Sequence, residues 1–353
     1  MVDDLKSAKK NVLFILDHAP DYRESFLSSM SRHHELTIIA APCDVIGLSP
    51  PKTRTGYKYI EGSPISFFGV SFDPIAFIYL LRSQHSIICV DLNLRRIERI
   101  LAFLLRGNNT RWVWWGPFFG ASKHKVINRL KRYLVTRASG CLTYTWPIAA
   151  ELGRWGVKNV RSFNNTQCLE ADFKLLSFDS DTSRIKMLFV GRFQERKNLE
   201  RLVDLAKRRL DVEIRLVGPH MENLSVPEQL LQEGRVQIYP KQEGDDLVPH
   251  FEWSHVVANP GHVGLLVMNT AQHRRGIVID QASQHAPEYW LAKEAEQPFV
   301  DFSSSEALDH FIDYCKTKPE YLVALGDKLQ QVARSRYTIE HMVSTHITFF
   351  NDI

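Results

Sequence analysis

Short apolar runs alternate with segments of helical periodicity along most of the chain, and this alternation restricts its fold more than any other feature. Strands joined through helices form parallel sheets, because each connection has to cross back over the sheet. In the first half, strands are expected at 11–16, 36–40, 86–90, 110–115, 142–145 and 160–164, with helices at 21–30 and from 147 onward. The sequence therefore predicts an α/β fold built on a parallel sheet.

The alternation starts again after a polar, turn-rich segment at 165–185. The second series has strands at 186–190, 213–217, 236–239, 255–258 and 276–279, with a helix at 198–207. A chain of 353 residues is too long for one ordinary core and fits two domains of about 150–200 residues. We predict a first domain at 1–168, a linker at 169–184, a second domain at 185–335 and a terminal helix at 336–353. Two successive sheets also predict a cleft, with ligands at the carboxyl ends of strands.

The composition is that of a soluble globular protein, with 44% hydrophobic and 24% charged residues. No run reaches the ~18 uninterrupted apolar residues that span a membrane, and the charged start before Asn11 does not fit a signal peptide. The cysteines are scattered and lack metal-pair spacing, at Cys43, Cys89, Cys141, Cys168 and Cys315. Free thiols in a reducing cytoplasm are therefore expected, and a structural zinc is not.

Charge is distributed unevenly between the two halves. Residues 1–170 carry 23 Lys and Arg against 13 Asp and Glu, whereas residues 171–353 carry 21 against 27. Between Arg99 and Ala150 there is no acidic residue at all. A basic first domain indicates a polyanionic partner for that domain. No recognised nucleic-acid-binding module accompanies this charge, so no nucleic-acid partner is expected.

A glycine and two cations follow the first strand of the second half, in Gly191-Arg-Phe-Gln-Glu-Arg-Lys197. Glycine lets the backbone turn sharply toward a ligand. Arg192 and Lys197 flank the loop at the start of the next helix, where the helix dipole also favours anions. An arginine fork with a lysine point charge suits a diphosphate. A solvated basic loop is the alternative, and the position directly after a strand favours diphosphate binding.

The segment 189–199 closely resembles the start of the donor-binding domain in family 4 glycosyltransferases. Leu216-Val-Gly-Pro219 resembles that family's second strand and turn, and 259–265 followed by 276–279 resembles its donor-sugar loop and next strand. The resemblance implies a GT-B fold, in which two Rossmann-like domains face a central cleft and the last helix returns to the first domain. It also implies transfer from a nucleotide sugar with retention of configuration.

Two positions of the donor-sugar loop depart from the usual family pattern. Gly261 and Asn269 occupy the positions of two glutamates. The segment Pro260-Gly-His-Val-Gly-Leu265 resembles a subgroup of the family that also lacks the first glutamate. The missing carboxylates bear on catalytic competence and not on fold. Many relatives have a histidine where this chain has Pro117, so no histidine role carries over there.

The resemblance assigns candidate site residues to both halves. It implies a diphosphate role, and so a catalytic one, for Arg192 and Lys197. The implied donor-binding set is Gly191, Arg192, Lys197, Gly261, His262, Val263, Gly264, Leu265, Asn269 and Glu288. On the acceptor side, related motifs fall at Tyr22, Arg23 and Trp115. A structural or exposed role remains open for His262, as does a helix-terminal role for Glu288. Neither a cofactor nor a metal ion is expected, because two cations already face the diphosphate.

The segment 122–137 has an amphipathic helical pattern. Val126, Leu130, Tyr133 and Leu134 share one face, and basic side chains lie beside it. One interpretation is a contact with an anionic membrane surface. The other is that the apolar stripe packs on the domain core while the basic side chains are solvated.

Together these features predict a glycosyltransferase. It would transfer a sugar from a nucleoside diphosphate donor to a glycan or lipid-linked acceptor, in bacterial surface polysaccharide synthesis, in the cytoplasm or on the inner face of the membrane. The rival interpretations are a non-catalytic GT-B protein that binds a nucleotide sugar or a partner, and a nucleotide-sugar epimerase. No phosphate loop, dinucleotide fingerprint, serine elbow or zinc-protease helix is present in the sequence.

Overall fold

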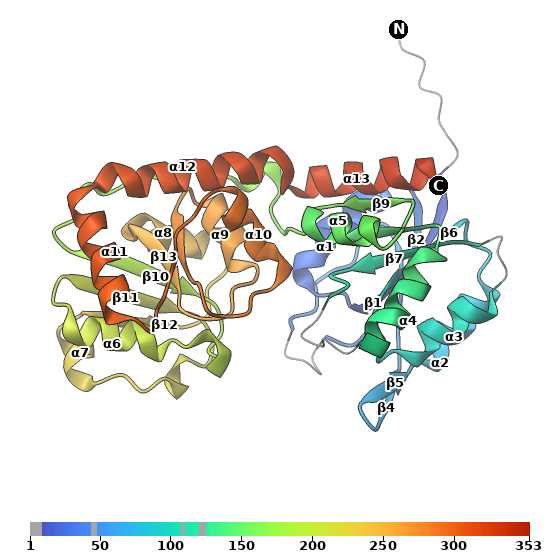
Figure 1. The fold of residues 1–353 in the computed structure, drawn as a ribbon, viewed down its shortest axis with the longest axis horizontal. Helices are drawn as coiled ribbons and strands as arrows, with labels where there is room; N and C mark the ends of the chain where they lie inside the picture. Colours follow the sequence, from blue (N-terminus) through green and yellow to red (C-terminus); the bar gives the residue numbers. More distant parts are fainter. Residues whose placement is uncertain (1–8, 44–47, 107–109, 120–124) are drawn as a thin grey trace, which may run out of the picture. The chain divides into compact units, whose positions relative to one another are not determined.

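The computed structural model describes residues 9–43, 48–106, 110–119 and 125–353 (Figure 1). The chain divides into two compact units, one of Met1–Gln167 with Ile339–Ile353 and one of Cys168–Thr338. Each unit is built on a parallel sheet, of seven strands in the first and six in the second. The predicted α/β class with two parallel sheets is therefore confirmed.

The sheet of the first unit has the order β3-β2-β1-β6-β7-β8-β9. Its strands are β1 (Asn11–His18), β2 (Glu35–Ala41), β3 (Lys58–Glu61), β6 (Ile87–Asp91), β7 (Arg111–Gly116), β8 (Gly140–Thr143) and β9 (Val160–Ser162). A separate antiparallel hairpin joins β4 (Ile65–Phe67) to β5 (Val70–Phe72). The sequence pattern did not predict β3 or this hairpin, because β3 is a partly exposed edge strand and the hairpin strands are only three residues long.

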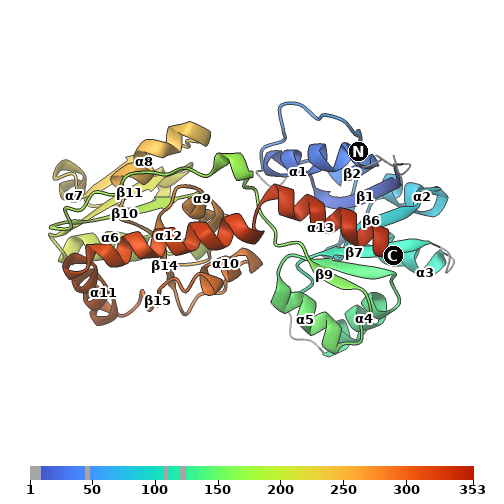
Figure 2. The same ribbon diagram turned by 90° about the horizontal axis from the view of Figure 1, so that it is seen from above.

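Helices cover both faces of this sheet. They are α1 (Asp21–Ser31), α2 (Pro74–Arg82), α3 (Ile97–Leu105), α4 (Lys125–Thr136), α5 (Trp146–Arg154) and α13 (Ile339–Asp352). Alternate side chains of β1 divide between the faces: Leu13 and Ile15 join the core beneath α2 and α3, whereas Phe14 packs on Phe26 of α1 and Phe350 of α13. Figure 2 shows α13 lying across these strands beside α1. The terminal helix is thus part of the first unit.

The sheet of the second unit has the order β12-β11-β10-β13-β14-β15. Its strands are β10 (Ile185–Val190), β11 (Val212–Val217), β12 (Val236–Tyr239), β13 (Val256–Asn259), β14 (Gly276–Asp280) and β15 (Phe299–Val300). Its α-helices are α6 (Glu200–Arg208), α7 (Glu228–Gln232), α8 (Val248–Trp253), α9 (Leu266–Gln272), α10 (Trp290–Glu294), α11 (Ser305–Thr317) and α12 (Pro319–Arg336). β10 lies between β11 and β13, so the loops after these strands meet at one edge of the sheet.

No helix in the described part of the chain is both long enough and apolar enough to cross a membrane. All five cysteines are buried and form no disulfide with one another. Leu134 and Val135 are the residues of α4 that pack into the core, whereas Val126, Leu130 and Tyr133 stay exposed. The apolar stripe expected at 122–137 is therefore split between core and surface, and residues 122–124 lie outside the described ranges.

Candidate functional site

Two glycines shape the turn after β10. Gly191 has φ 152° and Gly218, after β11, has φ 154°, a region that side chains rarely allow. A Cβ on Gly218 would lie 2.0 Å from the carbonyl oxygen of Gly191, so the two turns can pack together only without it. The N–H of Phe193 donates to the carbonyl of Pro219 at 3.0 Å and fixes the loop. This close packing places Arg192 and the residues after it at the carboxyl end of the sheet.

Lys197 ends the short 3-10 helix Glu195–Lys197 that follows this turn. Its Nζ donates a hydrogen bond of 2.5 Å to the carbonyl oxygen of His262. Burial, together with the nearby charges of Arg196 and Arg192, lowers the pKa of Lys197 to about 8. A half-buried ammonium beside two guanidinium groups, with one neutral acceptor, is a site that an anion would stabilise.

Gly261 packs directly against the backbone of the 195–197 helix. A Cβ on Gly261 would lie 2.3 Å from the carbonyl oxygen of Arg196 and 2.6 Å from the carbonyl carbon of Lys197. The N–H of His262 donates to that same Arg196 oxygen at 2.8 Å. Glycine at 261 is therefore required by this close approach, which gives a physical reason for its presence where the family that the sequence resembles usually has glutamate.

His262 is held in its neutral form. Its Nδ1 lies 2.7 Å from the carbonyl oxygen of Gln284, to which it donates. Burial lowers the pKa of His262, although this hydrogen bond opposes the shift. The backbone bond from Ala286 N–H to Val263 O, 2.9 Å, ties the same two loops together. The loop at 260–263 is thus fixed on one side by 195–198 and on the other by 284–286.

The sequence did not single out the ion pair beneath this loop. Asp280, at the end of β14, is fully buried and lies 3.2 Å from Arg201 of α6. The same guanidinium donates to the carbonyl of Pro260 at 3.2 Å. The sequence could have indicated this residue, because Asp280 is a carboxylate that directly follows the buried strand predicted at 276–279. Arg201 and Asp280 position the loop from below.

The remaining predicted donor residues follow in the next elements. Gly264 and Leu265 lead into α9, and Asn269 lies one turn into that helix, its N–H bonded to the carbonyl of Leu265 at 3.3 Å. Glu288 is buried in the short 3-10 helix Pro287–Tyr289. These contacts therefore bring Lys197 together with the loop that contains Gly261, His262 and Val263. Asn269 and Glu288 lie in the elements that follow this loop.

In the first unit, the three predicted acceptor-side residues line one cavity of about 850 Å³. Tyr22 and Arg23 come from the start of α1, and Trp115 comes from the end of β7. The Arg23 guanidinium lies 4.9 Å from the Trp115 ring and donates to the Tyr144 hydroxyl at 2.8 Å. Arg23 is buried, and its contacts with Trp115 and Tyr144 fix these aromatic side chains in place as well as adding a positive charge.

Trp115 is fixed from behind the cavity wall. Its indole N–H donates to Nε2 of His346 at 3.0 Å, and its ring stacks on Phe163 with centroids 5.0 Å apart. Burial lowers the pKa of His346 to about 3, which keeps it neutral and able to accept this bond. The structure therefore brings Tyr22, Arg23 and Trp115 together, as part of a rigid wall.

Two aspartates that the sequence interpretation missed also line this cavity. Asp17 is the last residue but one of β1 and Asp91 is the last residue of β6. The N–H of Asp17 donates to Oδ2 of Asp91 at 2.8 Å. Burial raises the pKa of Asp91 to about 7, and the charge of Asp17 adds to the rise. Among the described residues, Oδ1 of Asp91 has no hydrogen-bond donor. Because adjacent parallel strands end together, their positions after two buried strands could have revealed the pair.

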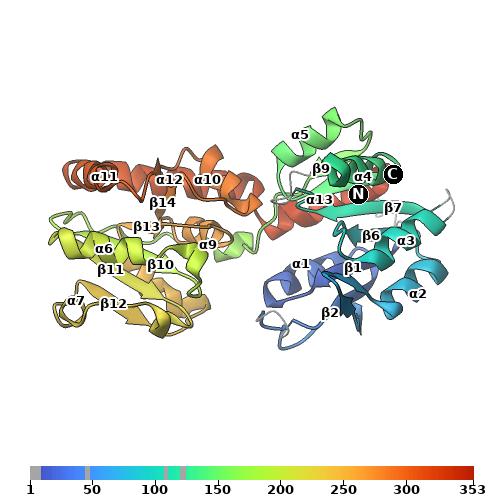
Figure 3. The same cartoon turned by 60° about the horizontal axis from the view of Figure 1, so that its bottom comes forward.

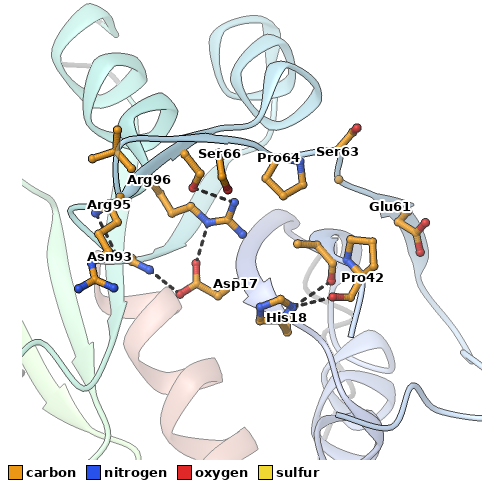
Figure 4. A pocket seen from close by; sticks show the side chains of 15 residues that line it. Asp17, His18, Pro42, Glu61, Ser63, Pro64, Ser66, Asn93, Arg95 and Arg96 are labelled. Carbon is orange, nitrogen blue, oxygen red and sulfur yellow. Dashed lines mark hydrogen bonds and ion pairs between the residues drawn. The ribbon is translucent and has the colours of Figure 1, made fainter. Parts of the chain in front are cut away.

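Asp17 is the charged member of the pair. Burial works against its ionisation, but Arg99 at 2.9 Å, together with Asn93 and Arg96, outweighs burial and lowers the pKa of Asp17. Figure 4 shows Asp17 also held by Asn93 and Arg96, at a second cavity of about 690 Å³ that shares Asp17 with the first. His18 turns the other way, toward the carbonyl oxygen of Pro42 at 2.9 Å. A carboxylate is thus presented at both cavities.

Among the described residues, no three His, Cys, Asp or Glu side chains gather as a metal site would require. No protein-family model matches the chain, and no curated protein matches it.

Solved structures match over nearly the whole chain. Sucrose-phosphate synthase from Thermosynechococcus elongatus is 14% identical with a TM-score of 0.69, covering 98% of this chain and 99% of its own. The HepE protein of Anabaena, in complex with UDP and glucose, is 12% identical with a TM-score of 0.67, covering 98% and 100%. A putative UDP-N-acetylglucosamine 2-epimerase from Listeria monocytogenes is 11% identical with a TM-score of 0.57, covering 96% and 95%. At these identities the likeness concerns the fold, and the chain has the GT-B fold found among glycosyltransferases.

Proposed function

We propose that this protein is a family 4-like glycosyltransferase that moves a sugar from a nucleoside diphosphate donor to a glycan or lipid-linked acceptor. The observation that carries the proposal is the interlocked loop of the second unit, where the ammonium of Lys197 is held at the carbonyl of His262 beside Gly261. The HepE protein of Anabaena has the same fold and was solved in complex with UDP-glucose, which supports the proposal.

In this proposal Arg192 and Lys197 bind the diphosphate and stabilise the charge that builds on it as the glycosidic bond breaks. Electrostatic stabilisation of this kind is often the largest contribution to catalysis. Two cations facing the leaving group replace the metal ion that other transferases use, so we expect no metal or cofactor. Retention of configuration is expected from the family resemblance, by attack on the same face that the leaving group vacates.

The donor sugar and base would lie against the loop that begins at Gly261. His262, neutral and fixed through Nδ1, presents Nε2 as an acceptor for a sugar hydroxyl. Val263, Gly264 and Leu265 supply backbone groups, and Asn269 supplies a neutral amide where relatives have a carboxylate. Glu288 remains a candidate contact to the donor.

The acceptor would occupy the cavity of about 850 Å³ in the first unit. Tyr22 and Trp115 form its aromatic wall, which suits the apolar faces of a sugar ring. Asp91 also lines this cavity, and its Oδ1 is a buried carboxyl oxygen that has no hydrogen-bond donor among the described residues. We propose a growing bacterial surface glycan as the acceptor, with the protein in the cytoplasm at the inner face of the membrane.

The test is incubation of the full chain with a panel of nucleotide sugars and glycan or lipid-linked acceptors, followed by chromatography of nucleotides and products. Release of nucleoside diphosphate together with a new glycoside supports the proposal. Binding without turnover would support a non-catalytic sugar-nucleotide-binding protein, to which the absent glutamates point. Altered sugar stereochemistry supports the epimerase alternative, which the Listeria neighbour favours.

A further inference from the structure

Exposed apolar side chains gather on one part of the first unit. Of the seventeen large apolar side chains exposed among the described residues, eleven lie on hairpin β4–β5 and on helices α2, α3 and α4. Leu104 and Leu105 of α3 are 52% and 66% exposed, and Val126 of α4 is 80% exposed. Single exposed apolar residues are ordinary, but a cluster of this size marks a contact surface.

These elements form one continuous surface, called here the apolar face. Helices α2 and α3 pack along each other, and β5 packs on α3. Figure 3 shows α2 and α3 side by side. Leu104 of α3 and Tyr133 of α4 line the same groove, so α4 continues the apolar face beyond α3. The hairpin projects beyond these helices in Figure 1.

The tip of the hairpin carries its most exposed side chain at a conformational cost. Phe67 pairs with Val70, so Phe68 and Gly69 form a two-residue turn with φ values of 45° and 80°. Such turns favour Asn-Gly, and a bulky aromatic residue at positive φ is unusual. Phe68 is nevertheless fully exposed and makes the strained turn without gaining any burial. This indicates that its ring has a partner outside the chain.

The charge around the apolar face is predominantly positive, although the exposed Glu61 lies near the hairpin. Between Gly62 and Ala150 the only acidic residues are Asp73 and Glu98, both buried, and Asp91, which lines the acceptor cavity. The exposed basic residues on and beside the helices include Arg82, Arg95, Arg111, Lys125, Arg129, Arg132 and Arg137. Apolar side chains within a basic border match the headgroup and acyl layers of an anionic bilayer.

A polar groove of about 250 Å³ lies between α3 and α4 on this face. Arg137 stacks on the Tyr133 ring at 4.2 Å, and Thr110 and Ser139 add hydroxyl groups to the groove. Arg106 is fixed beside them by bonds to Thr110 Oγ1 at 2.9 Å and to the carbonyl of Ser83 at 2.8 Å. Two guanidinium groups with hydroxyl donors are suited to a phosphate.

We propose that hairpin β4–β5 and helices α2, α3 and α4 form a docking face for an anionic phospholipid bilayer, in which Phe68 inserts among the lipids and the α3–α4 groove receives a headgroup phosphate. This surface extends the contact expected from 122–137 to elements far from it in sequence. The docking face stands on its own contacts and does not depend on the donor chemistry proposed above.

The test is co-sedimentation of the full chain with vesicles of phosphatidylcholine alone or with roughly 30% phosphatidylglycerol. We expect binding to the anionic vesicles only. The double substitution Phe67→Ser and Phe68→Ser should weaken it at least about tenfold, through lost apolar insertion. Arg129→Gln with Arg137→Gln should weaken it by a similar factor, and salt should matter less for that variant.

The matched control is Leu210→Ser with Leu231→Ser, which removes two exposed apolar side chains from the second unit, 72% and 42% exposed. It should bind vesicles as the unchanged protein does. Equal binding to both vesicle types, or no effect of the Phe67 and Phe68 changes, would overturn the proposal. So would a dimer in light scattering that these changes dissociate, because a second copy would then cover the face. Nucleoside diphosphate affinity, measured on the same variants, should not change, which separates this test from that of the proposed function.

Discussion

The Nζ of Lys197 lies 2.5 Å from the carbonyl oxygen of His262, and this bond joins the loop after β10 to the loop after β13. The two loops also meet where Gly261 touches the backbone of Arg196 and Lys197. The cation therefore does not sit on a solvated loop. It is part of a packed unit, and its environment explains both its lowered pKa and the glycine beside it.

Gly261→Glu should destabilise the protein and should not increase any transfer activity. The new Cβ would meet backbone atoms at 2.3 and 2.6 Å, which cannot move as a flexible side chain can. Overpacking of this kind costs about 1–3 kcal/mol. Urea unfolding of Gly261→Ala and Gly264→Ala provides the comparison, since a Cβ at Gly264 meets nothing nearer than 3.9 Å. Equal stability of the two alanine variants would contradict the packing described here.

Diphosphate affinity should fall as the pH rises through about 8. Burial lowers the pKa of Lys197 to about 8, with Arg196 and Arg192 contributing, so the ammonium is lost above that pH in the free protein. Calorimetric titration with UDP from pH 7 to 9.5 measures this. Lys197→Arg keeps its charge across the range and should bind with little pH dependence. A wild-type affinity that stays flat across this range would mean that Lys197 does not contact the ligand.

The lowered pKa of Lys197 also affects stability. Affinity for the diphosphate should fall as the pH rises, whereas the free energy of unfolding should increase. Between about pH 8 and the ordinary lysine value of 10.5, the unfolded chain binds the proton that the folded chain has released. The contribution of Lys197 to the free energy of unfolding therefore rises with pH in that window. Lys197→Met should remove this increment in urea unfolding at pH 8 and 10. If the free energy of unfolding changes with pH in the same way in Lys197→Met and in the wild type, the pKa of Lys197 is not lowered.

Asp91→Asn should stabilise the protein more at pH 8 than at pH 5. Burial and the charge of Asp17 raise the pKa of Asp91 to about 7, so its stabilising contribution is present below about pH 4 and is lost as the pH rises through 7. Asparagine stays neutral, and its carbonyl can still accept the N–H of Asp17. Urea unfolding at the two pH values gives the comparison. If Asp91→Asn changes the free energy of unfolding by the same amount at pH 5 and pH 8, the pKa of Asp91 is not raised.

Patterns in the sequence were sufficient for the class of fold, because both sheets consist of buried strands separated by helices. The family resemblance assigned Lys197, Gly261 and His262 to one donor site, and in the structure their loops meet because β10 and β13 are neighbours. Asp17 and Asp91 were missed because a carboxylate after a strand becomes informative only when the strand order is known. Hairpin β4–β5 was missed because a Phe-Gly turn lacks the residues that ordinarily signal one.

The amphipathic pattern of 122–137 left two interpretations open, and the structure divides them by residue. Leu134 packs into the core, whereas Val126, Leu130 and Tyr133 stay on the surface. A helical period cannot resolve this, because it states which side chains share a face and not how far a neighbouring element covers that face. Leu134 is covered where α4 packs on the sheet, and its carbonyl oxygen accepts the indole N–H of Trp114 in β7.

Arg192 and Lys197 are expected to bind the diphosphate of the donor, and calorimetric titration of UDP and GDP into the full chain at pH 7 measures this. A charge-assisted hydrogen bond contributes about 1.5–3 kcal/mol, so Arg192→Ala and Lys197→Ala should each weaken binding by about 10- to 100-fold. Lys207→Ala removes an exposed lysine of α6, paired with Asp204, and should bind as the wild type does. If Arg192→Ala and Lys197→Ala remain folded and bind the nucleotides with unchanged affinity, the diphosphate binds elsewhere and these two cations are not its site.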